Sequence, residues 1–277
     1  RMVIHAAASI NSQKQQINEL NVFPVPDGDT GTNMGMTIAT AATELRKKSH
    51  TSVGEVASVN ASALLRGARG NSGVILSLLF RGFAKAVKDK DAIDGRDLAI
   101  ALDYGVAAAY KAVMKPAEGT ILTVSRLAAA QAAAAAREDS HPQAVLEAAI
   151  KEGHIALANT IEQNPVLKKA GVVDAGGKGF LVILQGMLDE LTGVPMPETD
   201  GDAAEDHGAD FATLTDEDIT FTFDTVFIVR KTVKKSLDGL RSYLNSIGDS
   251  LVIGEDDEAF KVHVHTDIPG AALTEAQ

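Results

Sequence analysis

Hydrophobic residues in the first two thirds of the chain recur at the spacing of an amphipathic helix. After Ser72, for example, the apolar side chains fall on one helical stripe, at positions 74, 75, 78, 79 and 83. Alternating runs rich in β-branched residues, which would indicate strands, are few here. The pattern therefore predicts an all-α bundle over residues 1–194. Its helices are expected at 5–20, 32–48, from 72 onward, 97–114, 120–137, 141–163 and 177–191.

The pattern changes after residue 194. Residues 195–218 are acidic, small and proline-containing, with nine Asp or Glu between Glu198 and Asp218 and no Lys or Arg, which favours a flexible linker. Residues 219–277 are then typical of the start of an α+β domain. It is expected to contain a strand, a helix and two further strands, at 219–229, 231–246, 251–254 and 260–265.

Composition and charge exclude several classes of protein. The 277 residues contain no Cys, which excludes disulfides, Cys-based zinc sites and thiol nucleophiles and fits a reducing cytosol. The net charge is −11, which argues against a nucleic-acid binder that neutralises phosphates. No apolar run is long enough for an integral membrane segment, and the first residues show no signal-peptide pattern. We expect a cytoplasmic protein.

The breaks between the predicted helices are unusually rich in Gly and Pro. Ordinary bundle turns are short and need one Gly at most. Four turns here have polar tips as well, which suggests that one end of the bundle is built to bind a ligand. They cover residues 24–29, 67–73, 115–120 and 171–177.

The turn around Asp27, Gly28 and Asp29 is the best candidate for a metal site. A positive φ angle at Gly28 would let the two carboxylates converge, and magnesium prefers such oxygen ligands together with phosphates and water. Residues 30–33 then begin a helix, whose N–H groups favour a phosphate, with Thr30 or Thr32 as its cap. A plain surface turn is the alternative, and the Asp-Gly dipeptide alone favours it.

Two further turns resemble phosphate-binding helix starts. Ser72 is a candidate N-cap in the Gly70–Gly73 turn, where a nucleotide contact and a tight helix contact are equally supported. Asp174 is a candidate N-cap before Gly176 and Gly177, and a simple helix start is favoured there. P-loop, Rossmann and protein-kinase motifs are absent from the sequence, so any nucleotide binds in another way.

His263 and His265 lie on the same face of a predicted strand, because strand side chains alternate. Two imidazoles so placed can chelate zinc. On spacing alone, a partly exposed pair of strand histidines is the favoured interpretation.

Three of these segments together resemble the bacterial fatty acid kinase A family, namely residues 21–34, 67–73 and 173–177. The N-terminal domain of that family is similar to the nucleotide-binding L subunit of dihydroxyacetone kinase. The resemblance covers the whole chain. It implies an antiparallel eight-helix barrel that holds ATP or ADP and two magnesium ions at its open end, followed by a partial α+β middle domain.

The resemblance also implies a reaction and a set of site residues. ATP would phosphorylate a fatty acid, presented by a separate fatty-acid-binding carrier protein, to give an acyl phosphate for phospholipid synthesis. Asp27 and Asp29 would hold the metals, and Asn21 stands near the place of a third Asp in the dihydroxyacetone kinase pattern. The nucleotide contacts would come from Thr30, Gly31, Thr32, Asn33, Asn71, Ser72, Asp174, Ala175 and Gly176.

The family's middle domain carries a His-x-His pair and a Cys from its first strand as zinc ligands. Here Asp224 stands at the place of the Cys, so the resemblance implies a zinc site of Asp224, His263 and His265. It further implies a homodimer through the middle domain and a C-terminal domain for partner binding, so we expect this chain to be a fragment that is inactive alone.

Two alternatives remain at this point. A dihydroxyacetone-type kinase subunit is disfavoured by the fused second domain and by the form of the Asp-Gly-Asp loop. A non-catalytic nucleotide-binding regulator is the other, because the Asp pair distinguishes binding from non-binding but says nothing about turnover.

Overall fold

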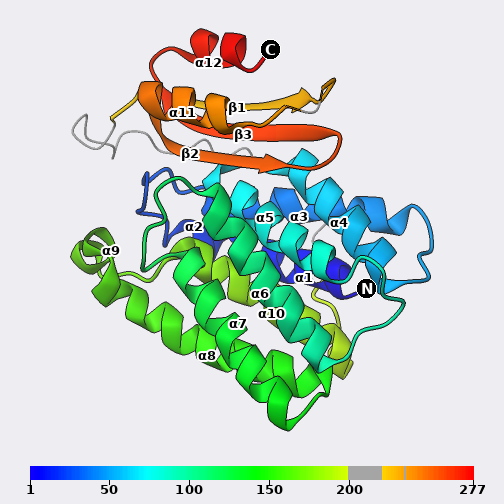
Figure 1. The fold of residues 1–277 in the computed structure, drawn as a ribbon. Helices are drawn as coiled ribbons and strands as arrows, with labels where there is room; N and C mark the ends of the chain where they lie inside the picture. Colours follow the sequence, from blue (N-terminus) through cyan, green and yellow to red (C-terminus); the bar gives the residue numbers. More distant parts are fainter. Residues whose placement is uncertain (199–219, 234) are drawn as a thin grey trace.

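The computed structural model describes residues 1–198, 220–233 and 235–277, which form a helical domain and a smaller domain built on a three-stranded sheet (Figure 1). The helical domain has eight long helices and two short ones. The long helices are α1 (Met2–Ser12), α3 (Thr30–Arg46), α4 (Val53–Gly67), α5 (Gly70–Ala86), α6 (Gly95–Ala112), α7 (Ile121–Glu138), α8 (Pro142–Gln163) and α10 (Ala175–Thr192). The short ones are α2 (Lys14–Asn18) and α9 (Pro165–Ala170).

The eight long helices close into a barrel. Each packs against the next long helix along the chain, and α10 packs against α1 to complete the ring. The connections are mostly short, so neighbouring helices run antiparallel. As a result α3, α5, α7 and α10, which are alternate members of the ring, begin at the same end. The structure thus confirms the predicted mainly α fold.

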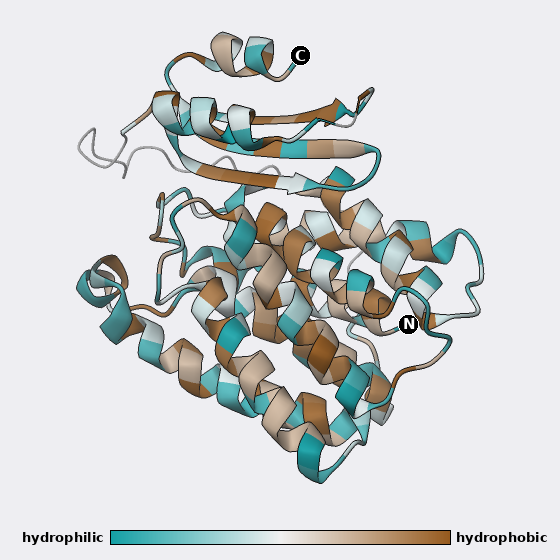
Figure 2. Cartoon of the chain, in the orientation of Figure 1, coloured by the Kyte–Doolittle hydropathy of each residue, from teal (hydrophilic) through white to brown (hydrophobic). Residues whose placement is uncertain are grey.

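The barrel core is made of aliphatic side chains and closely packed small residues. Leu64, Leu76, Leu146 and Ile183 are among its fully buried members. Figure 2 shows the most hydrophilic residues on the outer helix faces and in the loops. Every helix in the described ranges is too short or too polar to cross a lipid bilayer.

In the helical domain, the helices depart from the sequence prediction by more than two residues in three places. The predicted helix at 5–20 is broken at Gln13, where φ is −115° and ψ is 7°, into α1 and α2. The helix α4 was not predicted, because its small and polar residues give a weak periodic signal. Its start is nevertheless well defined, since Ser52 Oγ accepts a hydrogen bond from the N–H of Glu55 at 3.1 Å. The short helix α9 was also missed.

The second domain is an antiparallel sheet with strand order β1-β3-β2. Its strands are β1 (Phe223–Arg230), β2 (Gly248–Glu255) and β3 (Ala259–Thr266), and its helices are α11 (Asp238–Ile247) and α12 (Pro269–Glu275). The strands predicted at 251–254 and 260–265 are confirmed. The strand predicted at 219–229 begins only at Phe223, the helix predicted at 231–246 begins only at Asp238, and α12 was not predicted. The linker predicted at 195–218 lies outside the described residues from 199 onward, as does residue 219.

The sheet lies against one end of the helical barrel, with β2 closest to it (Figure 1). Val252 of β2 is buried in the helical core and forms an isolated bridge with Val113, just after α6. Gly254 packs so closely that an added Cβ would lie 2.9 Å from Cδ1 of Leu65. The two domains therefore share a packed interface next to the end where four helices begin.

Candidate nucleotide and metal site

A cleft of about 410 Å³ lies between the open end of the barrel and the sheet. Four helix N-termini open onto it, because α3, α5, α7 and α10 all begin there. The first turns contribute Thr30 of α3, Asn71 of α5, Ile121 of α7 and Gly176 of α10. Helix N-termini carry unpaired N–H groups and a positive partial charge, so this end of the barrel favours an anion.

The two predicted metal ligands lie together at the edge of this cleft. Gly28 has a φ angle of +66°, as the sequence predicted, and both Asp27 and Asp29 line the cleft. Burial raises the pKa of Asp27 to about 7, and the nearby charge of Asp29 adds to the rise. Asp29 occupies the N-cap position of α3, yet its carboxylate makes no capping hydrogen bond. The two carboxylates are thus close together in a position that suits a cation.

Asn21 positions this loop. Its Nδ2 donates to the carbonyl of Val25 at 2.6 Å and to Oδ1 of Asp27 at 3.0 Å, while its Oδ1 accepts from the Thr30 hydroxyl. The amide nitrogen, rather than the oxygen, therefore faces the candidate metal site. The role of Asn21 as a metal ligand stays a prediction, and these contacts favour orientation of Asp27.

Of the four residues at the start of α3 that were predicted to bind nucleotide, two line the cleft and two face away from it. Thr30 and Asn33 line the cleft, but Thr32 points to α2, where its N–H donates to Asn18 Oδ1 at 3.0 Å. Gly31 also faces α2, since an added Cβ would lie 2.2 Å from the carbonyl oxygen of Lys14. The predicted cap at Thr30 or Thr32 is wrong, because both residues lie inside the helix.

The turn between α4 and α5 brings Asn71 and Ser72 to the cleft, as predicted. Ser72 is not the N-cap, because α5 begins two residues earlier and Arg69 holds that position without a side-chain bond. The Oδ1 of Asn71 is buried and has no hydrogen-bond partner among the described residues. Thr37 supports the turn by accepting from the Arg69 N–H at 3.1 Å, a contact that no sequence signal indicated.

Asp174 caps α10, as the sequence suggested. Its Oδ2 accepts from the N–H of Gly177 at 2.7 Å, and its own N–H donates to Thr160. Burial raises the pKa of Asp174 to about 6, against the opposing effect of the Gly177 and Ile121 N–H groups. Asp174 and Gly176 line the cleft, whereas Ala175 is buried in the barrel core.

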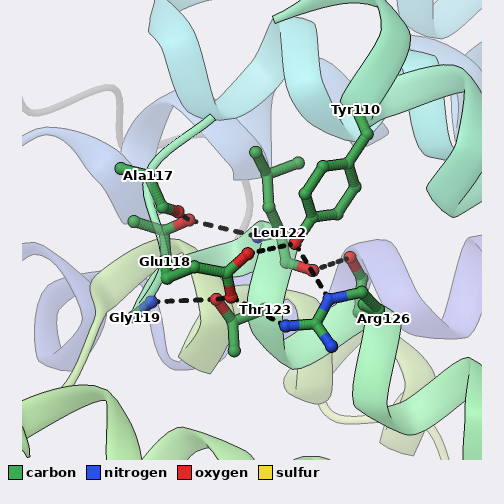
Figure 3. A network of polar contacts seen from close by, with 9 residues as sticks. Tyr110, Ala117, Glu118, Gly119, Leu122, Thr123 and Arg126 are labelled. Atoms are coloured by element: carbon green, nitrogen blue, oxygen red, sulfur yellow. Dashed lines mark hydrogen bonds and ion pairs between the residues drawn. The ribbon is translucent and has the colours of Figure 1, made fainter. Parts of the chain in front are cut away.

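The loop before α7 is held by the polar network in Figure 3. The carboxylate of Glu118 accepts from Tyr110 at 3.0 Å and from Thr123 and Arg126 at 2.7 Å each. The sequence singled out this turn but not its partners on α6 and α7. The network fixes the loop that presents Lys115 to the cleft.

The cleft is acidic despite its helix N-termini. Five Asp side chains line it. Among the described residues of the lining, Lys115 is the one Lys or Arg. The acidic residues are Asp27, Asp29, Asp174, Asp224 and Asp249. When ionised, these Asp side chains would repel a polyphosphate unless cations lay between them.

The sheet supplies the opposite wall, through the predicted histidines. His263 and His265 approach each other with 3.1 Å between their Nε2 atoms, and Nδ1 of His263 lies 3.3 Å from Oδ1 of Asp224. One ligand atom from each of these three residues falls within 4.8 Å of the others. Asp249, which the sequence did not indicate, lies 3.5 Å from Nδ1 of His265.

Charges on the two walls of the cleft influence each other. Burial raises the pKa of Asp224 and the charge of His265 lowers it, while the charge of Asp29 across the cleft raises it further. Burial also lowers the pKa of His263 to about 3, with a smaller effect of His265, so this imidazole is neutral and suited to bind a metal.

Comparisons with known proteins identify the family of both domains. Residues 24–189 match the DAK2 domain, and residues 220–277 match the middle domain of proteins like fatty acid kinase A. These are kinase-type domains, which indicates a kinase-related role.

Curated bacterial proteins are similar over the whole chain. Protein YloV of Bacillus subtilis (strain 168) is 42% identical over 286 residues, which cover 100% of this chain and 52% of YloV. The uncharacterized protein SH1689 of Staphylococcus haemolyticus is 42% identical, over 100% of this chain and 51% of that protein. The chain spans about half the length of the curated relatives it matches. It belongs to the DAK2 domain family and, with its second domain, to the fatty acid kinase A-like members of that family.

Proposed function

We propose that this chain binds ATP and magnesium in the interdomain cleft and forms the nucleotide-binding part of a kinase that phosphorylates a fatty acid carboxylate. A separate fatty-acid-binding carrier protein presents the acceptor. The observation that carries the proposal is the convergence of four helix N-termini and five Asp side chains on one cleft. Helix N-termini favour phosphates, and the carboxylates favour the cations that accompany a nucleotide.

The residues in the cleft suit magnesium. Asp27 and Asp29 would hold it, with Asn21 orienting Asp27 through its Nδ2 contact at 3.0 Å. Oxygen ligands from one or two carboxylates, completed by phosphates and water, are the usual magnesium environment. When bound, the metal supplies positive charge that neutralises the β- and γ-phosphates.

The chain's own groups position the nucleotide. The N–H groups in the first turns of α3 and α5 would donate to the phosphates, except that of Thr32, which donates to Asn18. The unpartnered Oδ1 of Asn71 is an acceptor for a ligand donor such as a hydroxyl or amino group. A carboxylate oxygen of the acceptor attacks the γ-phosphorus, the bond to the β–γ bridging oxygen breaks, and ADP leaves. A carboxylic acid is ionised at neutral pH, so the attack requires no general base.

Nucleotide titration tests the binding half of the proposal. A fluorescent ATP analogue suits this chain, which contains no Trp. We expect saturable binding that requires magnesium and weakens at least tenfold in Asp29→Asn. The matched control is Asp103→Asn, because Asp103 is exposed on the outer surface of α6. Magnesium-independent binding, or equal affinity in Asp29→Asn, would refute the metal assignment.

Phosphoryl transfer tests the acceptor. The full-length protein, with magnesium, ATP and a fatty acid on its carrier protein, should form an acyl phosphate that hydroxylamine traps as a hydroxamate. Dihydroxyacetone in place of the fatty acid should leave ATP unconsumed. Consumption with dihydroxyacetone but not with the fatty acid would instead favour the dihydroxyacetone-type kinase.

The sheet supports a second proposal, a zinc site formed by Asp224, His263 and His265. The 3.1 Å between the two Nε2 atoms is close to the roughly 3.4 Å that two ligands of a tetrahedral zinc ion have. Elemental analysis should find about one zinc per chain, lost in His263→Ala and retained in the control His154→Ala on α8. Zinc-free protein after growth in zinc-supplemented medium would exclude the site.

A further inference from the structure

The strand β3 carries a buried Lys side chain that points to the helical domain. Val262 and Val264 face the core of the second domain, so the alternate residues Lys261, His263 and His265 face the barrel. Lys261 is 8% exposed, and it is the one buried Lys or Arg in the described ranges. Burial of an ammonium group is unfavourable unless the group is hydrogen-bonded. The hydrogen bonds of Lys261 are therefore needed to keep its side chain buried.

These contacts lie on the other domain. The Nζ of Lys261 donates to the carbonyl of Arg66 at 3.1 Å and to the carbonyl of Ala68. Arg66 is in the last turn of α4, and Ala68 is its C-cap residue. Terminal helix carbonyls have no partner inside the helix and carry its negative partial charge. A cation from the second domain thus caps α4.

The capped segment leads directly into the nucleotide turn. Gly70, with a φ angle of +56°, follows Ala68 by two residues, and Asn71 and Ser72 come next and line the cleft. Thr37 of α3 holds the same segment from the other side, through the Arg69 N–H. The turn is therefore fixed between one bond from the barrel and two from the sheet.

Neighbouring contacts keep the sheet in register with this turn. Oε2 of Glu258 lies 3.2 Å from Nη2 of Arg66, and Gly254 packs on Leu65 of the same helix. These contacts to α4 come from β2, β3 and their connection.

From this geometry we infer that Lys261 is a positioning residue of the nucleotide site, which fixes the α4–α5 turn and makes nucleotide affinity depend on docking of the second domain. The inference rests on the proposed function, since it concerns the same cleft. It assigns to the second domain a role that does not require its histidines.

Three variants separate this role from a general effect on folding. Lys261→Met removes the hydrogen-bond donors but keeps an unbranched chain, and Lys261→Arg keeps a charged donor. Lys231→Met is the matched control, because Lys231 bonds within its own domain, to Glu255 and Asp256, at 2.7 Å each. Circular dichroism should show the same helix content in all three.

The measurements are the Kd of the magnesium–ATP analogue complex and amide hydrogen exchange of residues 66–73. We expect Lys261→Met to weaken binding about fivefold to twentyfold and to speed exchange in this turn, with Lys261→Arg intermediate and Lys231→Met within twofold of the wild type. Unchanged exchange in Lys261→Met, or an equal loss of affinity in Lys231→Met, would overturn the inference. If the wild type binds no nucleotide, the proposed function fails, while exchange of the turn still decides whether Lys261 orders it.

Discussion

Asn71 has a buried side-chain acceptor, and we propose that this acceptor serves a ligand rather than the fold. Its Oδ1 is buried without a hydrogen-bond partner in the described part of the chain, although the residue sits in the first turn of α5. A buried acceptor left unpaired costs about 1–3 kcal/mol, and an apolar side chain of similar shape avoids that cost.

Asn71→Leu should therefore separate stability from binding. We expect the free energy of unfolding, measured by urea denaturation without nucleotide, to stay the same or rise by about 1 kcal/mol. Affinity for the ATP analogue should fall about tenfold. Loss of stability together with unchanged affinity would show that Asn71 serves the fold and not the ligand.

Asp174 makes stability depend on pH. Its pKa is raised to about 6 in the folded state from an ordinary value of 3.8, so the folded chain binds the proton more tightly than the unfolded chain. The stability that protonation contributes is complete below pH 3.8 and is lost as the pH rises through 6.

Asp174→Asn removes this dependence while keeping a good N-cap residue. Relative to the wild type, the variant should gain about 2–3 kcal/mol in free energy of unfolding between pH 4 and pH 7, as the rise in pKa from 3.8 to about 6 implies. Urea denaturation of both proteins at the two pH values measures the difference. A difference that stays constant with pH would contradict the raised pKa.

Some glycines in the barrel allow the backbones of neighbouring helices to approach closely. An added Cβ on Gly82 of α5 would lie 2.1 Å from the carbonyl oxygen of Tyr104 on α6, whereas Gly35 of α3 has nothing within 4 Å. Both lie inside long helices, so alanine improves helix propensity equally at each.

Gly82→Ala and Gly35→Ala should consequently change stability in opposite directions. Forcing α5 from α6 should cost more than the roughly 1 kcal/mol that alanine gains in helix propensity, for a net loss of up to about 2 kcal/mol. The open site at Gly35 keeps the propensity gain of about 1 kcal/mol. Thermal or urea unfolding of the two variants checks the signs. Stabilisation by Gly82→Ala would show that the α5–α6 contact is looser than described.

Elements with strong periodicity were predictable from sequence, and the contacts between them were not. The stripe after Ser72 and the alternation around His263 and His265 indicated α5 and β3 correctly. The helix α4 escaped because Gly54, Ser58 and Asn60 dilute its apolar stripe. The Ser72 cap was misplaced, since a Gly with positive φ lets α5 begin earlier than the cap rule suggests.

For the candidate site, local motifs identified residues but not their orientation. Thr32 and Gly31 belong to the same motif as Thr30, yet α2 packs on that side of α3 and turns them away from the cleft. Asp249 and Lys261 carried no local signal, because their roles arise only when the sheet docks on the barrel. The homodimer through the second domain stays a prediction.

For the molecule as a whole, the central claim is that two domains enclose one metal–nucleotide site. The barrel contributes helix N-termini and Asp27 and Asp29, and the sheet contributes Asp224, Asp249 and the histidine pair.

A crystal structure of the protein with a non-hydrolysable ATP analogue and Mn²⁺, recorded at the manganese absorption edge, tests this claim most directly. We predict anomalous peaks within coordinating distance, about 2.2 Å, of the Asp27 and Asp29 carboxylates, with the triphosphate at the starts of α3 and α5. A nucleotide bound elsewhere, or phosphates at these helix ends with no manganese on either Asp, would contradict it.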